Sequence, residues 1–156
     1  MRGKRAKTRK QLLDSKYGNS VIGRLINKVM QGGRKTIAEK MVYEALEKGA
    51  ETVKEKDVVA FIERVIINVK PSLEIKARRV GGANYSVPVP VSPRRQEALT
   101  IRWIVDAARK KSGKSFQELL TAELVSAYNG EGDAIKRKLD TERMAEANKA
   151  FAHFRW

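Results

Sequence analysis

Residues 73–91 read LEIKARRVGGANYSVPVPV. The runs 73–80 and 85–91 have the composition of β-strands, and the Gly-Gly-Ala-Asn between them is typical of a tight turn. Pro88 and Pro90 lie two positions apart, so both missing N–H groups fall on the same edge of the second strand, and that edge cannot join a larger sheet. The stretch therefore predicts a two-stranded antiparallel β-ribbon that protrudes from the rest of the chain.

The predicted ribbon carries the positive charges of Lys76, Arg78 and Arg79. A two-stranded ribbon is marginally stable alone in water. One with this charge is expected to be an arm that extends toward a polyanion. In the simplest register Val80 lies opposite Tyr85, and Arg78 and Arg79 then point to opposite faces of the ribbon.

The remainder of the chain has the periodicity of amphipathic helices. Six helices are predicted, and the longest apolar one, after the ribbon, is expected to be central. The first three helices are expected to run from Asn19-Ser20 to Gly32-Gly33, from Lys35 to the region past Gly49, and from Asp57 to Pro71. The last three are expected to run from Ser92-Pro93 to the basic segment 109–114, from the capping box Ser115-Phe-Gln-Glu118 to Asn129-Gly130, and from Asp133 to about Phe151. The expected fold is mainly α: one domain, 1–156, a six-helix bundle with an inserted ribbon.

Composition narrows the function classes. The chain has 156 residues and a formal net charge of +15, with 33 Lys and Arg against 18 Asp and Glu. Such an excess favours an anionic partner. There is no cysteine, so disulfides and thiolate metal sites are excluded, and a reducing cytoplasm is expected. No apolar run approaches the roughly 20 residues of a membrane span.

Residues 1–16 are basic with almost nothing to bury, which predicts a disordered tail in the free protein.

Basic residues gather in separate clusters along the chain, which predicts a surface that contacts folded nucleic acid in several places. Arginine favours phosphate because its planar fork makes two parallel hydrogen bonds. The predicted RNA-binding residues are Arg2, Lys4, Arg5, Lys7, Arg9, Lys10, Arg34, Lys35, Lys76, Arg78, Arg79, Arg94, Arg95, Arg102, Arg109, Lys110, Lys111 and Lys114.

Two other function classes compete with an RNA-binding protein. An architectural DNA-binding protein also uses proline-containing ribbon arms, but it places an apolar wedge at the tip, where this chain has Gly81-Gly82-Ala83. A nucleotide-dependent enzyme would rest on the resemblance of segment 109–115 to a phosphate-binding loop. That pattern needs glycine where Ala108 stands and a strand before it, where a helix is predicted.

Catalytic and metal sites are not predicted. His153 is the only histidine, and without cysteine or a nearby serine–aspartate pattern it forms no metal site or triad. Packing with the aromatic residues around it, Phe151, Phe154 and Trp156, is the expected role. No cofactor is expected, and the protein is predicted not to be an enzyme.

Three segments resemble the bacterial type of the small-subunit ribosomal protein seven family. They are Lys70-Pro71 with Glu74–Val89 (EIKARRVGGANYSVPV), Ala108–Ser115 (ARKKSGKS), and Arg143–Trp156 (RMAEANKAFAHFRW). The resemblance extends over almost the whole chain in family order. Phe154 departs from it, since tyrosine is usual at that position.

The resemblance implies direct binding to the 3′ major domain of small-subunit ribosomal RNA and nucleation of the assembly of the subunit head. It also implies that the ribbon, through Arg78, Arg79, Gly81, Gly82 and Tyr85, lies near the exit-site tRNA and the mRNA. Ribosomal proteins nine and eleven are the implied protein neighbours. The chain is expected to be a monomer within a cytoplasmic ribosome, without contact to a membrane.

Overall fold

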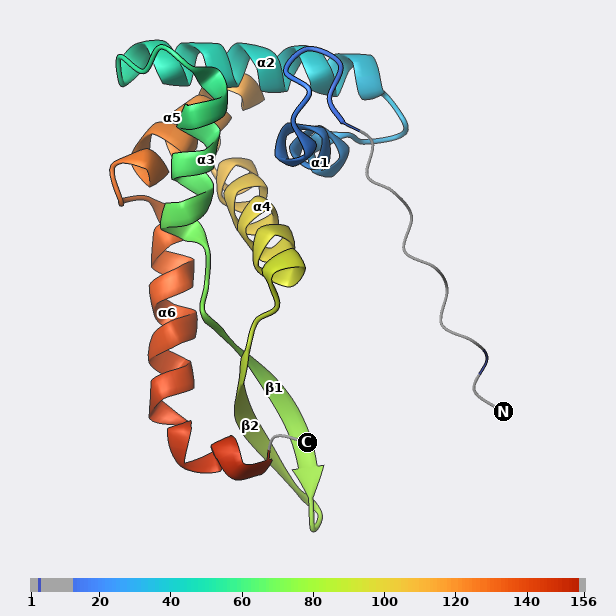
Figure 1. Cartoon of the computed structure of the whole chain (residues 1–156), viewed down its shortest axis with the longest axis vertical. Helices are drawn as coiled ribbons and strands as arrows, with labels where there is room; N and C mark the ends of the chain where they lie inside the picture. Colours follow the sequence, from blue (N-terminus) through green and yellow to red (C-terminus); the bar gives the residue numbers. More distant parts are fainter. Residues whose placement is uncertain (1–2, 4–12, 155–156) are drawn as a thin grey trace.

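The computed structural model describes Gly3 and residues 13–154. Its helices and strands, in chain order, are α1 (Ser20–Val29), α2 (Lys35–Thr52), α3 (Val58–Val69), β1 (Leu73–Val80), β2 (Ala83–Pro90), α4 (Pro93–Lys110), α5 (Phe116–Tyr128), α6 (Asp133–Ala147) and the 3₁₀ helix η1 (Lys149–Phe154). Helices α1 to α5 pack together at one end of the molecule, while the ribbon extends away from them and α6 runs alongside it (Figure 1). The predicted mainly helical fold with one inserted ribbon is confirmed.

Capping side chains fix where two of the helices, α1 and α3, begin. The Asn19 side chain accepts a hydrogen bond from the Val21 N–H at 2.7 Å, and the Asp57 side chain accepts one from the Val59 N–H at 2.8 Å. These bonds satisfy N–H groups that have no partner inside the helix. Ser115 occupies the cap position of α5, but its side chain makes no capping hydrogen bond, so the predicted capping box is not formed.

Helix α4 lies at the centre of the packing, as predicted. It contacts α1, α3, α5 and α6, and its buried side includes Ile104 and Val105. Helix α2 does not fray past Gly49 but continues to Thr52. A Cβ atom at Gly49 would lie 2.9 Å from the Phe61 ring, so the absence of a side chain lets α2 and α3 approach closely.

The ribbon is a sheet of two antiparallel strands, as predicted. Its register differs from the expected one, because Val80 pairs with Ala83 and Tyr85 pairs with Arg78. The loop is therefore only two residues long. Both of its residues, Gly81 and Gly82, have positive φ, 57° and 90°, which is the backbone of the type I′ turn that matches the twist of a hairpin.

The end of the chain supports the ribbon. Helix α6 ends at Ala147, earlier than predicted, and η1 turns across toward the strands (Figure 1). The Tyr85 ring lies 5.2 Å from the Phe151 ring and 5.0 Å from the Phe154 ring, between centroids. His153 packs against Phe154 at 4.0 Å, in agreement with its predicted packing role.

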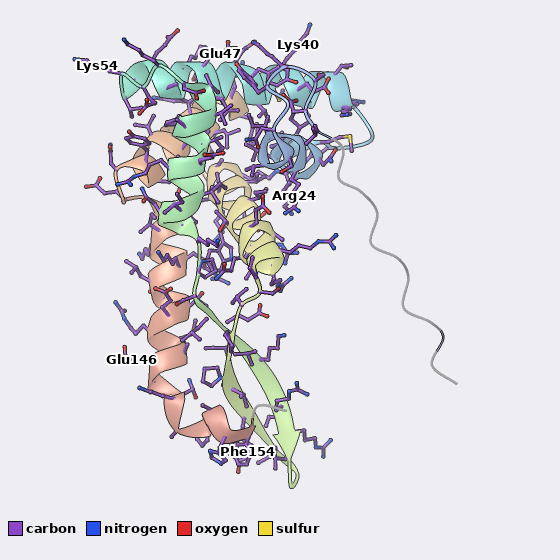
Figure 2. All side chains as sticks on the ribbon, in the orientation of Figure 1. Arg24, Lys40, Glu47, Lys54, Glu146 and Phe154 are labelled. Atoms are coloured by element: carbon purple, nitrogen blue, oxygen red, sulfur yellow. The ribbon has the colours of Figure 1, made fainter. Side chains whose placement is uncertain are left out.

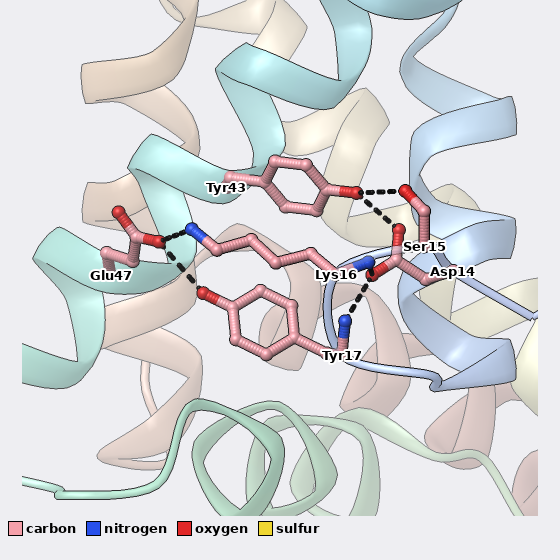
Figure 3. A network of polar contacts seen from close by, with 6 residues as sticks. All are labelled: Asp14, Ser15, Lys16, Tyr17, Tyr43 and Glu47. Atoms are coloured by element: carbon pink, nitrogen blue, oxygen red, sulfur yellow. Dashed lines mark hydrogen bonds and ion pairs between the residues drawn. The ribbon is translucent and has the colours of Figure 1, made fainter.

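The predicted disordered tail, residues 1–16, includes residues that are part of the fold. Residues 1–2 and 4–12 lie outside the described part of the chain, but Asp14 is buried. It accepts hydrogen bonds from Tyr43 Oη at 2.6 Å and from the Tyr17 N–H at 2.9 Å. Glu47 of α2 pairs with Lys16 and accepts a hydrogen bond from Tyr17 Oη at 2.8 Å (Figure 3). Residues 14–17 are therefore anchored to α2 and belong to the folded domain.

Candidate nucleic-acid interface

Helix α4 carries basic side chains along the side that the other helices leave exposed. Arg95, Arg102 and Arg109 are spaced by seven residues, which places them close to one line along a helix. Arg94, next to Arg95, is exposed as well. In Figure 1, α1, α4 and the ribbon follow one another along one side of the molecule. We call the exposed cations of α4 and the ribbon the basic side; they are Lys76, Arg79, Arg94, Arg95, Arg102, Arg109 and Lys110.

Two of the predicted RNA-binding residues share one carboxylate at the base of the ribbon. The two Glu74 oxygens lie 3.2 Å from Lys76 Nζ and 3.2 Å from Arg95 Nε. Glu74 is mostly buried, whereas both cations are about half exposed. The shared carboxylate links the ribbon to the first turn of α4. It also offsets part of the unfavourable interaction of Arg95 with the helix dipole.

Two other predicted residues bind groups within the protein. Arg109 Nη2 donates hydrogen bonds to the carbonyl oxygens of Val29, at 3.1 Å, and Lys28, at 3.4 Å. Lys111 Nζ lies 2.6 Å from an oxygen of Glu123, which is inaccessible to solvent. Arg109 thus satisfies carbonyls at the end of α1, and Lys111 neutralises a buried charge. Sequence reasoning missed both roles because the partners lie on other elements.

The cations of the ribbon have different surroundings. Arg78 is half-buried and pairs across the strands with Tyr85, on the face that η1 covers. Arg79 is exposed on the opposite face. Their predicted separation onto two faces holds in the observed register, since neighbouring residues on a strand always alternate.

Exposed cations also occur at the two loops beside α4. Arg34 and Lys35 lie at the start of α2, and Lys35 makes a 3.7 Å ion pair with Glu39. Lys114 is exposed in the loop between α4 and α5. This loop follows helix α4 rather than a strand, so it lacks the strand–loop–helix context of a nucleotide-binding loop.

Charge is distributed unevenly over the chain. Residues 39–64, from α2 to the middle of α3, contain five Lys and Arg against seven Asp and Glu, whereas the rest contains 28 against 11. Lys40 and Glu47 project from α2 at the end of the molecule away from the ribbon (Figure 2). The α2–α3 surface is therefore the less favourable one for a polyanion, and α4 with the ribbon is the more favourable one.

Sequence reasoning also missed a basic pair on α6. Lys136 and Arg137 line a groove between α4 and α6 together with Arg102 and Lys110. Four acidic residues line the same groove, namely Glu74, Asp106, Asp133 and Asp140. The run Lys136-Arg137-Lys138 was the available signal. Nothing in the sequence indicates that α6 lies beside α4, so this run does not by itself predict a basic groove.

Six of the predicted RNA-binding residues belong to the part of the tail that the structure does not describe. The tail residues Arg2, Lys4, Arg5, Lys7, Arg9 and Lys10 lie beyond the described residues. Within residues 13–154 no cluster of three metal-ligating side chains occurs. No helix of that part is long and apolar enough to cross a membrane.

Comparison with known proteins decides the family. Residues 1–149 match the family described as ribosomal protein S7p/S5e. The chain belongs to this family. It is 52% identical over 152 residues to the small ribosomal subunit protein uS7 of Moorella thermoacetica, covering 97% of each chain. It is 51% identical over 156 residues to the protein of the same name from Thermotoga neapolitana, covering 100% of each.

Membership of the S7p/S5e family confirms the resemblance found in the sequence. The family is one of structural proteins of the small ribosomal subunit and not a family of enzymes. The protein is accordingly a ribosomal protein located in the ribosome. The residues predicted to bind RNA stay predictions.

Proposed function

We propose that this protein binds small-subunit ribosomal RNA directly, in the 3′ major domain, and nucleates assembly of the subunit head. The exposed cations of α4, the ribbon and the adjacent loops form the RNA-binding surface. The observation that carries the proposal is the placement of exposed arginines along α4 and the ribbon, on a chain whose α2–α3 surface has more acids than bases.

The ribbon has a second role in this proposal. Its tip, Gly81-Gly82-Ala83, is exposed and small, so an RNA backbone can approach it closely. The tip lies at the end of the molecule opposite α2 (Figure 1). The ring contacts between Tyr85 and η1 suit an element that must hold a fixed position beside moving ligands. We infer that it lies near the exit-site tRNA and the mRNA, and that ribosomal proteins nine and eleven are neighbours.

Hydroxyl-radical footprinting of small-subunit ribosomal RNA tests the proposal. The wild-type protein should protect nucleotides of the 3′ major domain, and duplex DNA at matched salt should not compete. Replacing Arg94, Arg102 and Lys114 together with alanine should weaken the protection. The matched control removes three exposed cations from the α2–α3 surface, Lys40, Lys48 and Lys56. Protection confined to other domains, or equal weakening by both variants, would overturn the proposal.

A further inference from the structure

A groove of about 770 Å³ opens between the end of α1, the start of α2 and the junction of α4 with α5. Its lining combines the apolar side chains of Ile37, Met41 and Phe116 with the guanidinium groups of Arg34 and Arg109. The volume falls within the roughly 300–1,000 Å³ of pockets that hold small ligands.

The groove exposes apolar surface that the fold does not need to expose. The Ile37 side chain is 48% exposed, although it lies in the first turn of α2, where a polar residue would serve the helix equally well. Gly32, in the loop before α2, also lines the groove, and a Cβ added there would meet nothing within 4 Å. The groove is therefore open beside this glycine.

Arg109 is held ready for a ligand. Its hydrogen bonds to the carbonyls of Val29 and Lys28 fix the guanidinium in place. A planar cation that is already immobilised loses little conformational entropy when a flat ring stacks on it. Within residues 13–154 no Asp or Glu lines this groove, so its charge complements an anionic chain and not a basic peptide.

We propose that this groove accepts an unpaired nucleobase of an RNA strand, whose phosphate pairs with Arg34. Unstacked bases are recognised by stacking on aromatic rings or arginine planes, and a groove with apolar walls and cationic edges provides for both the base and its backbone. The proposal rests on the proposed function and deepens it, because it assigns one part of the RNA-binding surface to a base rather than to phosphates.

The test uses the full-length protein with Ile37→Ser and a matched control. Ile67→Ser makes the same change at an isoleucine of α3 that is 63% exposed and does not line the groove. Chemical probing of base edges on a 3′ major domain fragment should show one or two unpaired bases protected by wild type. Those protections should be lost with Ile37→Ser and kept with Ile67→Ser, while affinity falls about fivefold or more in the first variant alone.

Thermal midpoints of the two variants establish that both are folded at the probing temperature. Identical protection of every unpaired base by wild type and Ile37→Ser would overturn the nucleobase assignment. If the same variant also bound a ribosomal protein more weakly than wild type does, the groove would belong to a protein partner. If wild type protects no part of the fragment, the proposed function itself fails, and the two failures are distinguishable.

Discussion

Lys111 Nζ lies 2.6 Å from Oε2 of Glu123, a carboxylate with no exposed surface. The other oxygen, Oε1, accepts a hydrogen bond from the Ala134 N–H at 2.9 Å. A Cβ atom at Gly132 would lie 3.0 Å from that same oxygen. One buried side chain of α5 thus joins the α4–α5 loop to the first turn of α6, which it caps from a neighbouring helix.

Glu123→Ala should lower the free energy of unfolding by about 1–3 kcal/mol, since it leaves the buried Ala134 N–H without its partner. Glu123→Gln should cost less, because the amide oxygen can still accept the bond from Ala134. Urea unfolding measures both values. A double-mutant cycle with Lys111→Met should show coupling between the two residues. A cost below about 1 kcal/mol for Glu123→Ala would contradict the assigned role of this carboxylate.

Two truncations should differ in stability. Deleting residues 1–12 should leave the thermal midpoint unchanged while weakening RNA binding, because it removes cations and leaves the Asp14 network intact. Deleting residues 1–16 should also lower the midpoint, since Asp14 and Lys16 are lost and the bonds to Tyr43 and Glu47 with them. Asp14→Ala in the full chain should also lower the midpoint. We expect it to lower the free energy of unfolding by about 1–3 kcal/mol. Equal midpoints for both truncations would show that the network does not stabilise the fold.

The Glu47 network should make stability depend on acid pH. The hydrogen bonds from Lys16 and then Tyr17 hold the pKa of Glu47 below its usual 4.5. A carboxyl group with a lowered pKa in the folded state contributes stability above its unfolded pKa and loses it as pH falls through the folded value. Thermal midpoints measured from pH 7 to 3 should therefore fall less in Glu47→Gln than in wild type at the acid end. Parallel curves would show that Glu47 is not a source of acid sensitivity.

The two ribbon arginines should behave differently when replaced singly by alanine. Arg79→Ala should leave stability unchanged, because its side chain is exposed on the face away from η1. Arg78→Ala should speed hydrogen exchange of ribbon amides, since it lies beside Tyr85 on the supported face.

The double variant Arg78→Ala, Arg79→Ala should fold and enter subunits. Those subunits should bind exit-site tRNA less well or maintain the reading frame less accurately. Incorporation is measured by the protein content of purified subunits, and exit-site tRNA by its binding to them. A folded double variant that fails to enter subunits would instead place both arginines in the primary RNA anchor.

Local signals in the sequence predicted the elements well. Asn19 and Asp57 announce helix starts through bonds only two residues long, and Pro88 with Pro90 limits the sheet to two strands. The predicted register, with Val80 opposite Tyr85, was wrong, because Gly-Gly-Ala-Asn fits a four-residue loop as well as a two-residue one. The positive φ angles of both glycines select the shorter loop.

Partners distant in sequence explain what was missed at the candidate site. Arg109 binds carbonyls 80 and 81 residues away, and Asp14 binds Tyr43 across 29 residues. A basic residue in a loop looks the same in sequence whether it binds RNA or a buried carboxylate, as Lys111 does. Only the tertiary packing distinguishes these cases.

The dependence of RNA affinity on salt measures how many phosphates the protein neutralises. If about 6 to 10 phosphates are neutralised, log K for the 3′ major domain fragment should fall with log salt at a slope of about −4 to −9. Replacing Arg94, Arg102 and Lys114 with alanine should make the slope shallower by about 2 to 3. Replacing Lys40, Lys48 and Lys56 should leave it unchanged. A wild-type slope shallower than about −2, or an equal change in both variants, would contradict binding through the basic side.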